Sequence, residues 1–350
     1  MAAKTILCTL GPASLRPDVL KELDAREIDL FRINLSHTPL DAVESTIEFV
    51  RRYSSTPICI DTEGAQIRCG TMMPGVVVTT GQAIRLTSAE RLGMADTLAV
   101  RPASVFDALQ VGSILRVDFD GAQLRVTTVG DGEAEAIVID DGHIGSNKAV
   151  TIDPPPRLPP FTDHDVGAIE VSVRHGIRDF ALSFTNDAED VARFRDVLPA
   201  DAHVIAKIEN RGGVQNVEGI TSAADAVLID RGDLSREVAI EYVPVYQKHI
   251  IRCANALNTP VFVATNLLES MVRNRVPTVA EANDIVNTLY DGAHGLVLAA
   301  ETAIGEHPVQ SVDMVLRILE AFERSTARPV LGEQADATRG PEAAAVNFGT

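Results

Sequence analysis

The sequence has 350 residues and a formal net charge of -18, from 49 Asp and Glu against 31 Lys and Arg. This acidic balance argues against nucleic acid as a partner, because phosphate binding needs a basic stripe and none is visible. No run of 18 apolar residues occurs, so the sequence predicts no membrane span. With 45% hydrophobic residues the chain is typical of a globular protein, and its length suits one large domain or a large domain with a small one inserted.

The amino terminus and the cysteines bear on the cellular compartment. The first residues run straight into an apolar segment without a signal-peptide pattern, so we expect a cytoplasmic protein. The cysteines show no CxxC spacing, and we expect reduced thiols rather than zinc ligands or disulfides at Cys8, Cys59, Cys69 and Cys253.

Eight short apolar runs predict strands, and each except the third is closely followed by a segment of helical periodicity. The runs lack period-two alternation, which is typical of strands buried on both faces. Eight such units in succession predict a closed (β/α)8 TIM barrel, an α/β fold. The runs lie at 4–11, 29–37, 57–64, 178–184, 203–210, 226–234, 260–268 and 295–305.

The segment 69–156 interrupts this alternation after the third strand. It is rich in Val, Thr and Gly, with turn signals such as "FDGA" and "GDGE", and predicts a small inserted β domain. It closes with the proline-rich "IDPPPRLPPF", a stiff hinge at 152–161. We therefore expect a barrel formed by 1–68 and 157–325, an inserted lid at 69–156, and a disordered tail at 326–350.

Nearly every predicted barrel strand ends in polar residues. Active sites of such barrels lie at the carboxyl ends of the strands, so this clustering predicts an active site there. The residues at these ends are Arg32, Asn34, Ser36, His37, Asp61, Thr62, Arg68, Ser183, Lys207, Glu209, Asp230, Arg231, Asp233, Thr265, Asn266, Glu301 and Thr302.

Lys207 and Glu209 are two residues apart, so they share one face of a strand. They could form a structural ion pair, in which Glu209 or Asp233 is the partner of Lys207. Alternatively, Glu209 and Asp233 hold a divalent cation through hard carboxylate oxygens, beside a lysine that stabilises anionic oxygen. We favour the second interpretation.

A second group combines one carboxylate with three neutral side chains: Asn34, Ser36, Asp61 and Thr62. A single charge suggests a monovalent cation, although a plain hydrogen-bonded network fits the spacing nearly as well. Arg32, Arg68 and Lys148 are the local cations that a small anionic substrate would require in so acidic a chain.

Several motifs together resemble the pyruvate kinase family. They include "FRINLSH", "IDTEGAQIR", "AKIEN", "DRGDL" and the long stretch at 277–308, and they occur in the family's order over roughly residues 4–320. The resemblance implies a barrel with a β lid after strand three. It also implies phosphoryl transfer between phosphoenolpyruvate, or a related enol phosphate, and ADP through a metal-bound enolate, with Mg²⁺ (or Mn²⁺) and K⁺ as cofactors.

The same resemblance assigns roles to residues of this sequence. Glu209 and Asp233 would hold the divalent cation, and Asn34, Ser36, Asp61 and Thr62 would hold K⁺. Lys207 would stabilise the transferring phosphoryl group and the enolate. Thr265 with the backbone of Gly232 and Asp233 would bind the substrate carboxylate. Residues facing the nucleotide would be Arg32, His37, Arg68, Asp120 and Lys148. The candidate catalytic residues are therefore Lys207, Arg32 and Thr265. We add Asp230 to them because of its position in the sequence next to this group.

The sequence also departs from the family pattern. Glu63 stands where the family usually has lysine, Gln66 replaces a glutamate, Asn186 an arginine and Asn266 a glutamine. The family's carboxy-terminal domain has no counterpart here, so we expect a homodimer or a monomer.

Asp230 is the departure closest to the expected chemistry, since the family has alanine there. It could pair with Arg231 or a neighbouring lysine, although on a strand Arg231 would point to the opposite face. Otherwise it contacts the metal through a water, binds a polar group of a larger substrate, or handles a proton at the enolate carbon. This departure and Glu63 keep an alternative open, a divalent-metal-dependent lyase (aldolase or decarboxylase) that acts on a 2-oxo acid by way of the same enolate.

Overall fold

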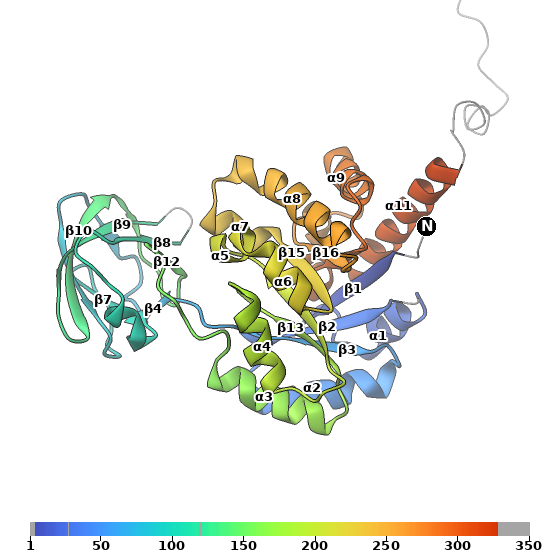
Figure 1. Cartoon of the computed structure of the whole chain (residues 1–350), viewed down its shortest axis with the longest axis horizontal. Helices are drawn as coiled ribbons and strands as arrows, with labels where there is room; N and C mark the ends of the chain where they lie inside the picture. The colour runs from blue at the N-terminus through green and yellow to red at the C-terminus, as the bar shows by residue number, and fades with distance from the viewer. Residues whose placement is uncertain (1–3, 27, 119–120, 328–350) are drawn as a thin grey trace, which may run out of the picture.

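The computed structural model describes residues 4–26, 28–118 and 121–327 (Figure 1). Eight parallel strands close a barrel in the order β1-β17-β16-β15-β14-β13-β3-β2. The predicted (β/α)8 barrel with a β domain after its third strand is confirmed. The barrel strands are β1 (Thr5–Leu10), β2 (Leu30–Asn34), β3 (Ile58–Asp61), β13 (Asp179–Leu182), β14 (His203–Ile208), β15 (Ala226–Asp230), β16 (Val261–Ala264) and β17 (Gly295–Leu298).

The barrel strands are apolar on both faces because each face packs against a different core. Leu7, Leu228 and Val297 belong to one buried cluster, whereas their neighbours Ile229 and Leu298 belong to a larger one that includes helical residues. Successive residues of a strand point to opposite faces, so a barrel with a filled interior and a helical shell needs apolar side chains throughout. The absence of alternation in the sequence follows from this arrangement.

Helices surround the barrel, and several begin close to the strand ends that carry polar residues. The helix α7 starts directly after β15, with no intervening loop. The α-helices are α1 (Pro17–Asp24), α2 (Leu40–Tyr53), α3 (Asp163–Arg174), α4 (Ala188–Asp196), α5 (Arg211–Gln215), α6 (Val217–Ala223), α7 (Arg231–Glu237), α8 (Val243–Ala256), α9 (Val279–Tyr290), α10 (Ala300–Ala303) and α11 (Pro308–Ala327). Short 3-10 turns occur at η1 (Leu35–His37), η2 (Ala103–Asp107), η3 (Ile240–Tyr242) and η4 (Glu269–Val272).

The inserted domain stands to one side of the barrel (Figure 1, left). It has a seven-stranded sheet in the order β12-β8-β9-β10-β6-β7-β4 and a two-stranded sheet of β11 and β5, with its own buried core. The strand β12 includes 152 and 153, so the predicted proline-rich hinge begins as a strand. The strands are β4 (Arg68–Cys69), β5 (Val77–Val78), β6 (Ala83–Thr87), β7 (Thr97–Arg101), β8 (Ile114–Val117), β9 (Gln123–Val129), β10 (Glu133–Asp140), β11 (Gly142–His143) and β12 (Val150–Asp153).

Both segments that connect the insert to the barrel form hydrogen bonds with residues at the beginning of a helix. The backbone N–H groups of Glu63 and Gly64 donate to the buried carboxylate of Asp165, in the first turn of α3. In the returning segment, Arg157 donates to Asp190 Oδ1 over 2.9 Å and also pairs with Asp187, the N-cap of α4. These contacts fix where the two connections leave the barrel.

The remaining sequence expectations concern the carboxyl end, the cysteines and the membrane. Helix α11 ends at Ala327, so 326 and 327 continue the helix, whereas the rest of the expected disordered tail lies outside the described residues. The cysteines Cys8, Cys59, Cys69 and Cys253 are free in this structure. Within the described ranges, no helix is long and apolar enough to cross a membrane.

Candidate active site

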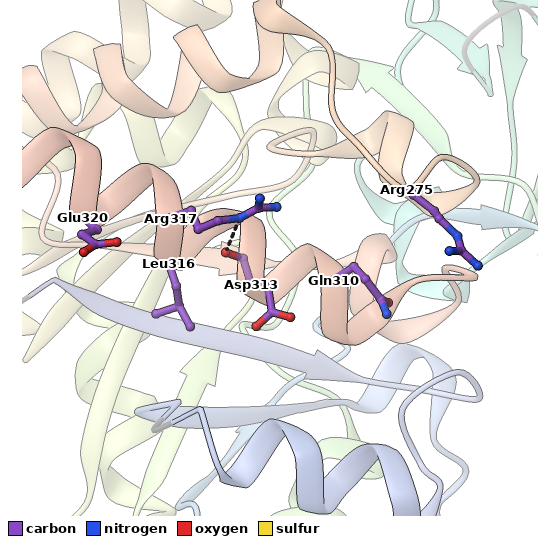
Figure 2. Close-up of a pocket in the computed structure, with 6 residues that line it drawn as sticks. All are labelled: Arg275, Gln310, Asp313, Leu316, Arg317 and Glu320. Carbon is purple, nitrogen blue, oxygen red and sulfur yellow. Dashed lines mark hydrogen bonds between the residues drawn. The ribbon is translucent and has the colours of Figure 1, made fainter. Parts of the chain in front are cut away.

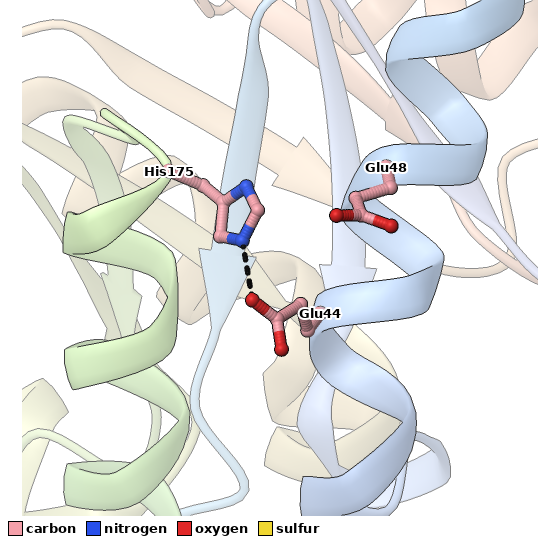
Figure 3. A group of neighbouring side chains, drawn as sticks. All are labelled: Glu44, Glu48 and His175. Atoms are coloured by element: carbon pink, nitrogen blue, oxygen red, sulfur yellow. Dashed lines mark hydrogen bonds and ion pairs between the residues drawn. The ribbon is translucent and has the colours of Figure 1, made fainter.

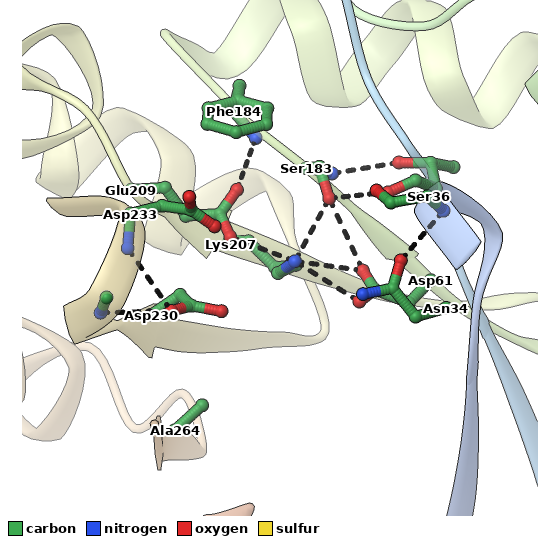
Figure 4. A network of polar contacts seen from close by, with 12 residues as sticks. Asn34, Ser36, Asp61, Ser183, Phe184, Lys207, Glu209, Asp230, Asp233 and Ala264 are labelled. Carbon is green, nitrogen blue, oxygen red and sulfur yellow. Dashed lines mark hydrogen bonds and ion pairs between the residues drawn. The ribbon is translucent and has the colours of Figure 1, made fainter. Parts of the chain in front are cut away.

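Lys207, on β14, lies at the centre of a buried polar network at the carboxyl ends of the barrel strands (Figure 4). Its Nζ lies 2.9 Å from Glu209 Oε1 and 3.0 Å from Asp61 Oδ1, and it donates to Ser183 Oγ over 3.0 Å. Burial alone would lower the pKa of Lys207, but the Asp61 and Glu209 carboxylates outweigh burial and raise it. Lys207 is therefore a cation held inside the barrel.

Arg32 provides a second buried cation beside the first. Its Nη1 donates to Asp61 Oδ2 over 2.9 Å and its Nε donates to Thr9 Oγ1 over 2.8 Å. The carboxylate of Asp61 thus contacts two cations, Arg32 and Lys207, which offset its single charge.

Three carboxylates gather on the other side of Lys207. One oxygen each of Glu209, Asp230 and Asp233 lies within 4.8 Å of the others. Burial raises the pKa of Glu209 to about 8, although Lys207 opposes this effect. Burial and the nearby Asp230 charge also raise the pKa of Asp233. Burial thus disfavours the charge of both carboxylates, a cost that a bound cation would offset.

The backbone around Glu209 directs its carboxylate towards this group. Phe184 has a left-handed φ of 52°, and its N–H donates to Glu209 Oε2 over 2.7 Å. Glu209 Oε1 is buried; it lies close to Lys207 Nζ, but outside hydrogen-bond geometry, and has no hydrogen-bond partner. One oxygen of Glu209 therefore fixes its orientation, and the other lies beside the Lys207 ammonium without a hydrogen bond.

Asp230 ends β15 and caps the following helix. Its Oδ1 accepts from Gly232 N at 3.2 Å and from Asp233 N at 3.5 Å, as an N-cap side chain does. Thr265 Oγ1 lies 3.1 Å from Asp230 Oδ1, but it donates to Ala264 O over 2.6 Å and accepts from Gly232 N at 2.8 Å. Among the alternatives considered for Asp230, pairing with Arg231 or a lysine is not the arrangement seen here, because its side chain accepts from backbone N–H groups instead.

Arg231 is the first residue of α7, so the chain turns where the sequence suggested that a strand might continue. Its guanidinium donates to Thr265 O over 3.0 and 2.6 Å and to Asp284 Oδ2 over 2.6 Å. Thr265 and Asn266 have left-handed φ values of 66° and 53°, a strained conformation for a β-branched residue such as Thr265. Arg231 thus holds the strained turn that carries the Thr265 hydroxyl.

The four residues predicted for a monovalent cation form hydrogen bonds within the protein. Asn34 Oδ1 accepts from Ser36 N at 2.9 Å, and Thr62 Oγ1 accepts from Ser183 N at 2.9 Å. The oxygens of Asp61 contact Arg32 and Lys207. These contacts fit the hydrogen-bonded network that the spacing also allowed.

Of the residues predicted to face a nucleotide, Arg68 and Lys148 lie in the inserted domain, whereas Arg32 belongs to the buried network around Asp61. Arg68 donates to Gln66 Oε1 over 2.7 Å, and Lys148 lies 2.6 Å from Asp118. Among the described residues, neither of the two cations hydrogen-bonds to the Lys207 network. His37 ends η1 and is exposed, whereas Asp120 lies outside the described residues. A cleft of about 500 Å³ between the lid connections and the barrel includes Gln66, Asn186 and Asp233 in its lining.

Sequence reasoning gave no role to three groups of this network. Ser183 donates to Thr62 O over 2.7 Å and accepts from Lys207, and the Phe184 N–H orients Glu209. Arg236 Nη1 lies 2.9 Å from Asp233 Oδ1 on α7. The three-residue spacing of Asp233 and Arg236 signals their helical pairing, whereas the backbone N–H of Phe184 leaves no mark in the sequence.

Two other groups of polar side chains lie away from this network. A pocket of about 600 Å³ along α11 is lined by Arg275, Gln310, Asp313, Leu316, Arg317 and Glu320 (Figure 2). On the surface, His175 Nε2 lies 2.9 Å from Glu44 Oε1, near Glu48 (Figure 3). Exposed pairs of this kind contribute little to stability and are common without a ligand.

Comparison with known proteins identifies the family. The family model described as pyruvate kinase, barrel domain, matches residues 1–312. The chain belongs to the pyruvate kinase family. Its relatives include pyruvate kinases of Sporosarcina psychrophila, 34% identical over 91% of this chain, and of Geobacillus stearothermophilus, 36% identical over 92%. The alignments span 56% and 58% of those relatives, so the chain covers little more than half of their length.

A solved structure shows the same relationship in three dimensions. A pyruvate kinase from Cryptosporidium parvum aligns with a TM-score of 0.83 at 28% identity, over 92% of this chain and 69% of the other. The structural similarity to a pyruvate kinase thus extends over most of the chain.

The departures from the pyruvate kinase pattern fall into two places. Gln66 and Asn186 line the cleft at the lid, and Glu63 Oε2 lies 3.6 Å from His164 Nδ1 in the connection to the lid. Asp230 is different, because it lies within the group that also contains Glu209 and Asp233. It is therefore the departure most able to alter the chemistry.

Proposed function

We propose that this site transfers a phosphoryl group between an enol phosphate, phosphoenolpyruvate or a close relative, and ADP. The observation that carries the proposal is the buried cation Lys207, set between Asp61 and the Glu209 carboxylate group at the mouth of a pyruvate kinase barrel. Phosphoryl transfer depends mainly on positioning and on positive charge around the transferring oxygens. The network offers both.

The residues present fit a divalent cation, Mg²⁺ or Mn²⁺. Glu209 has a buried oxygen without a hydrogen bond, and Asp233 is a second hard ligand in the same group. When bound, the cation supplies positive charge against phosphoryl and carbonyl oxygens. Glu209 and Asp233 would hold it.

The other residues act on the substrates directly. The Lys207 ammonium donates hydrogen bonds to the transferring phosphoryl group, and Arg32 adds a second cation next to it. The Thr265 hydroxyl and the N–H groups of Gly232 and Asp233 are the donors for a substrate carboxylate. His37, Arg68, Asp120 and Lys148 would bind the nucleotide when the lid closes and excludes water.

The case for K⁺ is weaker. Asp61 is the charged member of the proposed set, and its oxygens contact Arg32 and Lys207. Asn34, Ser36 and Thr62 add neutral oxygens only. We assign no step to K⁺, and a comparison of turnover in KCl with turnover in choline chloride measures its contribution.

The experiment is an assay of pyruvate formation from phosphoenolpyruvate, ADP and Mg²⁺, coupled to an indicator reaction. We expect turnover that depends on both ADP and Mg²⁺ and is abolished by a chelator. Release of pyruvate and inorganic phosphate without consumption of ADP would be hydrolysis and would contradict the proposal. The lyase, for which the comparisons offer no support over the kinase, would instead be shown by metal-dependent cleavage of a 2-oxo acid.

A further inference from the structure

The ion pair between Asp233 and Arg236 joins the carboxylate group of the site to the cleft at the lid. Asp233 Oδ1 lies 2.9 Å from Arg236 Nη1, and both residues belong to α7. Both line the cleft of about 500 Å³, and Asp233 is also grouped with Glu209 and Asp230. Arg236 therefore places a positive charge on an oxygen of a carboxylate that is proposed to hold the divalent cation.

Two other arginines of the cleft lining have their partners outside the carboxylate group. Arg157 donates to Asp190 Oδ1 over 2.9 Å, and Arg211 Nε donates to the backbone oxygen of Glu237 over 2.6 Å. A cation bound by the carboxylate group would not compete for either partner. Arg236 differs from both, because its partner is itself a proposed ligand of the cation.

Arg236 is the member of the pair that can move away. Its side chain is 41% exposed, whereas that of Asp233 is 26% exposed. A divalent cation and a guanidinium on the same carboxylate repel each other, and the cation concentrates twice the charge on a hard oxygen ligand. Exposed pairs of residues three apart on a helix are weak, so this pair yields to the cation.

We propose that Arg236 and the divalent cation compete for Asp233, so that Arg236 lowers the affinity of the site for the cation and contacts the anionic substrate once it is displaced. The inference rests on the proposed function, since it takes Asp233 as a ligand of the cation. The displaced guanidinium stays within the cleft lining, and its planar fork of donors suits phosphate or carboxylate oxygens. Arg236 thus exchanges a carboxylate of the protein for an oxygen of the substrate.

The first test measures the binding of Mn²⁺ alone, through the paramagnetic resonance signal of the free ion. Arg236→Gln keeps the helix propensity and removes the competing charge, so the Kd for Mn²⁺ should fall about two- to fivefold. Arg211→Gln is the matched control, because it removes an equal charge from the same cleft without touching Asp233. Its Kd should equal that of the wild type.

Three results of this titration would overturn the inference. An unchanged Kd in Arg236→Gln would show that Arg236 does not compete. An equal fall in both variants would show a general effect of charge in the cleft. A higher Kd in Arg236→Gln would show that Arg236 orients Asp233 for the cation instead of competing with it.

The second test measures turnover of phosphoenolpyruvate at saturating Mn²⁺. Loss of the displaced guanidinium should raise the KM of Arg236→Gln for phosphoenolpyruvate about fivefold, and more than it lowers kcat. The variant should therefore bind the cation more tightly and the anionic substrate more weakly, a combination that partial unfolding does not produce. An unchanged KM would contradict the contact between Arg236 and the substrate.

The outcomes separate this inference from the proposed function. If Arg236→Gln binds Mn²⁺ more tightly but neither it nor the wild type transfers phosphoryl groups, the proposed function fails and the competition for Asp233 stands. If the wild type turns over phosphoenolpyruvate and both proteins bind Mn²⁺ equally, the inference is overturned and the proposed function remains. Binding of Mn²⁺ to neither protein would overturn the inference as well, and the assay of pyruvate formation would then decide the proposed function.

Discussion

Lys207 is 4% exposed, yet it carries a full charge, and it does so only because Asp61 and Glu209 surround it. Removal of one member of a buried ion cluster leaves the others uncompensated. We expect Lys207→Met to lower the free energy of unfolding by about 3–5 kcal/mol, measured by denaturant titration. Lys248→Met removes an exposed pair with Asp291 and should cost less than about 1 kcal/mol. Equal losses in the two variants would contradict a buried charged network.

Glu209 and Asp233 should matter for activity rather than for stability. Because burial already disfavours their charges, Glu209→Gln or Asp233→Asn should keep the fold while removing a ligand of the divalent cation. We expect turnover to fall about 10²-fold or more. Binding of Mn²⁺, followed by its paramagnetic resonance signal, should weaken in parallel, whereas Asp291→Asn should change neither. Unaltered turnover of the wild type in excess chelator would refute the assignment.

At the scale of elements, the junction of β15 and α7 with the end of β16 positions the donors proposed for the substrate carboxylate. Arg231 bridges this junction with a planar fork of donors to Thr265 O and Asp284, which lysine cannot reproduce. We expect Arg231→Lys to raise the KM for phosphoenolpyruvate more than it lowers kcat, because the strained Thr265 turn relaxes. Arg26→Lys, which alters a remote pair with Asp313, is the control. An equal rise of the KM for phosphoenolpyruvate in both variants would indicate a general loss of stability instead.

The lid is the second element whose contribution can be measured. Lys148 lies on the inserted domain with its side chain 48% exposed, paired with Asp118. If the lid closes on a nucleotide, Lys148→Ala should raise the KM for ADP several-fold and leave the affinity for Mn²⁺ unchanged. A variant with unaltered ADP kinetics would remove Lys148 from the nucleotide site.

At the scale of the whole molecule, the barrel could be predicted from the sequence because each of its strands is buried on both faces. Lys207, Glu209 and Asp233 are polar residues at the ends of apolar runs in the sequence, so their clustering could be predicted as well. What the sequence could not give was the partner of each side chain. The hydrogen bonds of Asp230 depend on the helix that begins at Arg231. The orientation of Glu209 depends on the backbone N–H of Phe184, a residue in the left-handed conformation, and a residue pattern does not reveal such a contact.

The central claim is that this barrel moves a phosphoryl group from an enol phosphate to ADP. It is tested most directly by ³¹P nuclear magnetic resonance of the protein with phosphoenolpyruvate, ADP and Mg²⁺. We predict that the enol phosphate resonance decays while the γ-phosphate resonance of ATP grows at the same rate, and that Asp233→Asn abolishes both changes. An enol phosphate signal that stays constant in folded, metal-loaded protein, or one that decays to inorganic phosphate without ATP, would contradict the claim.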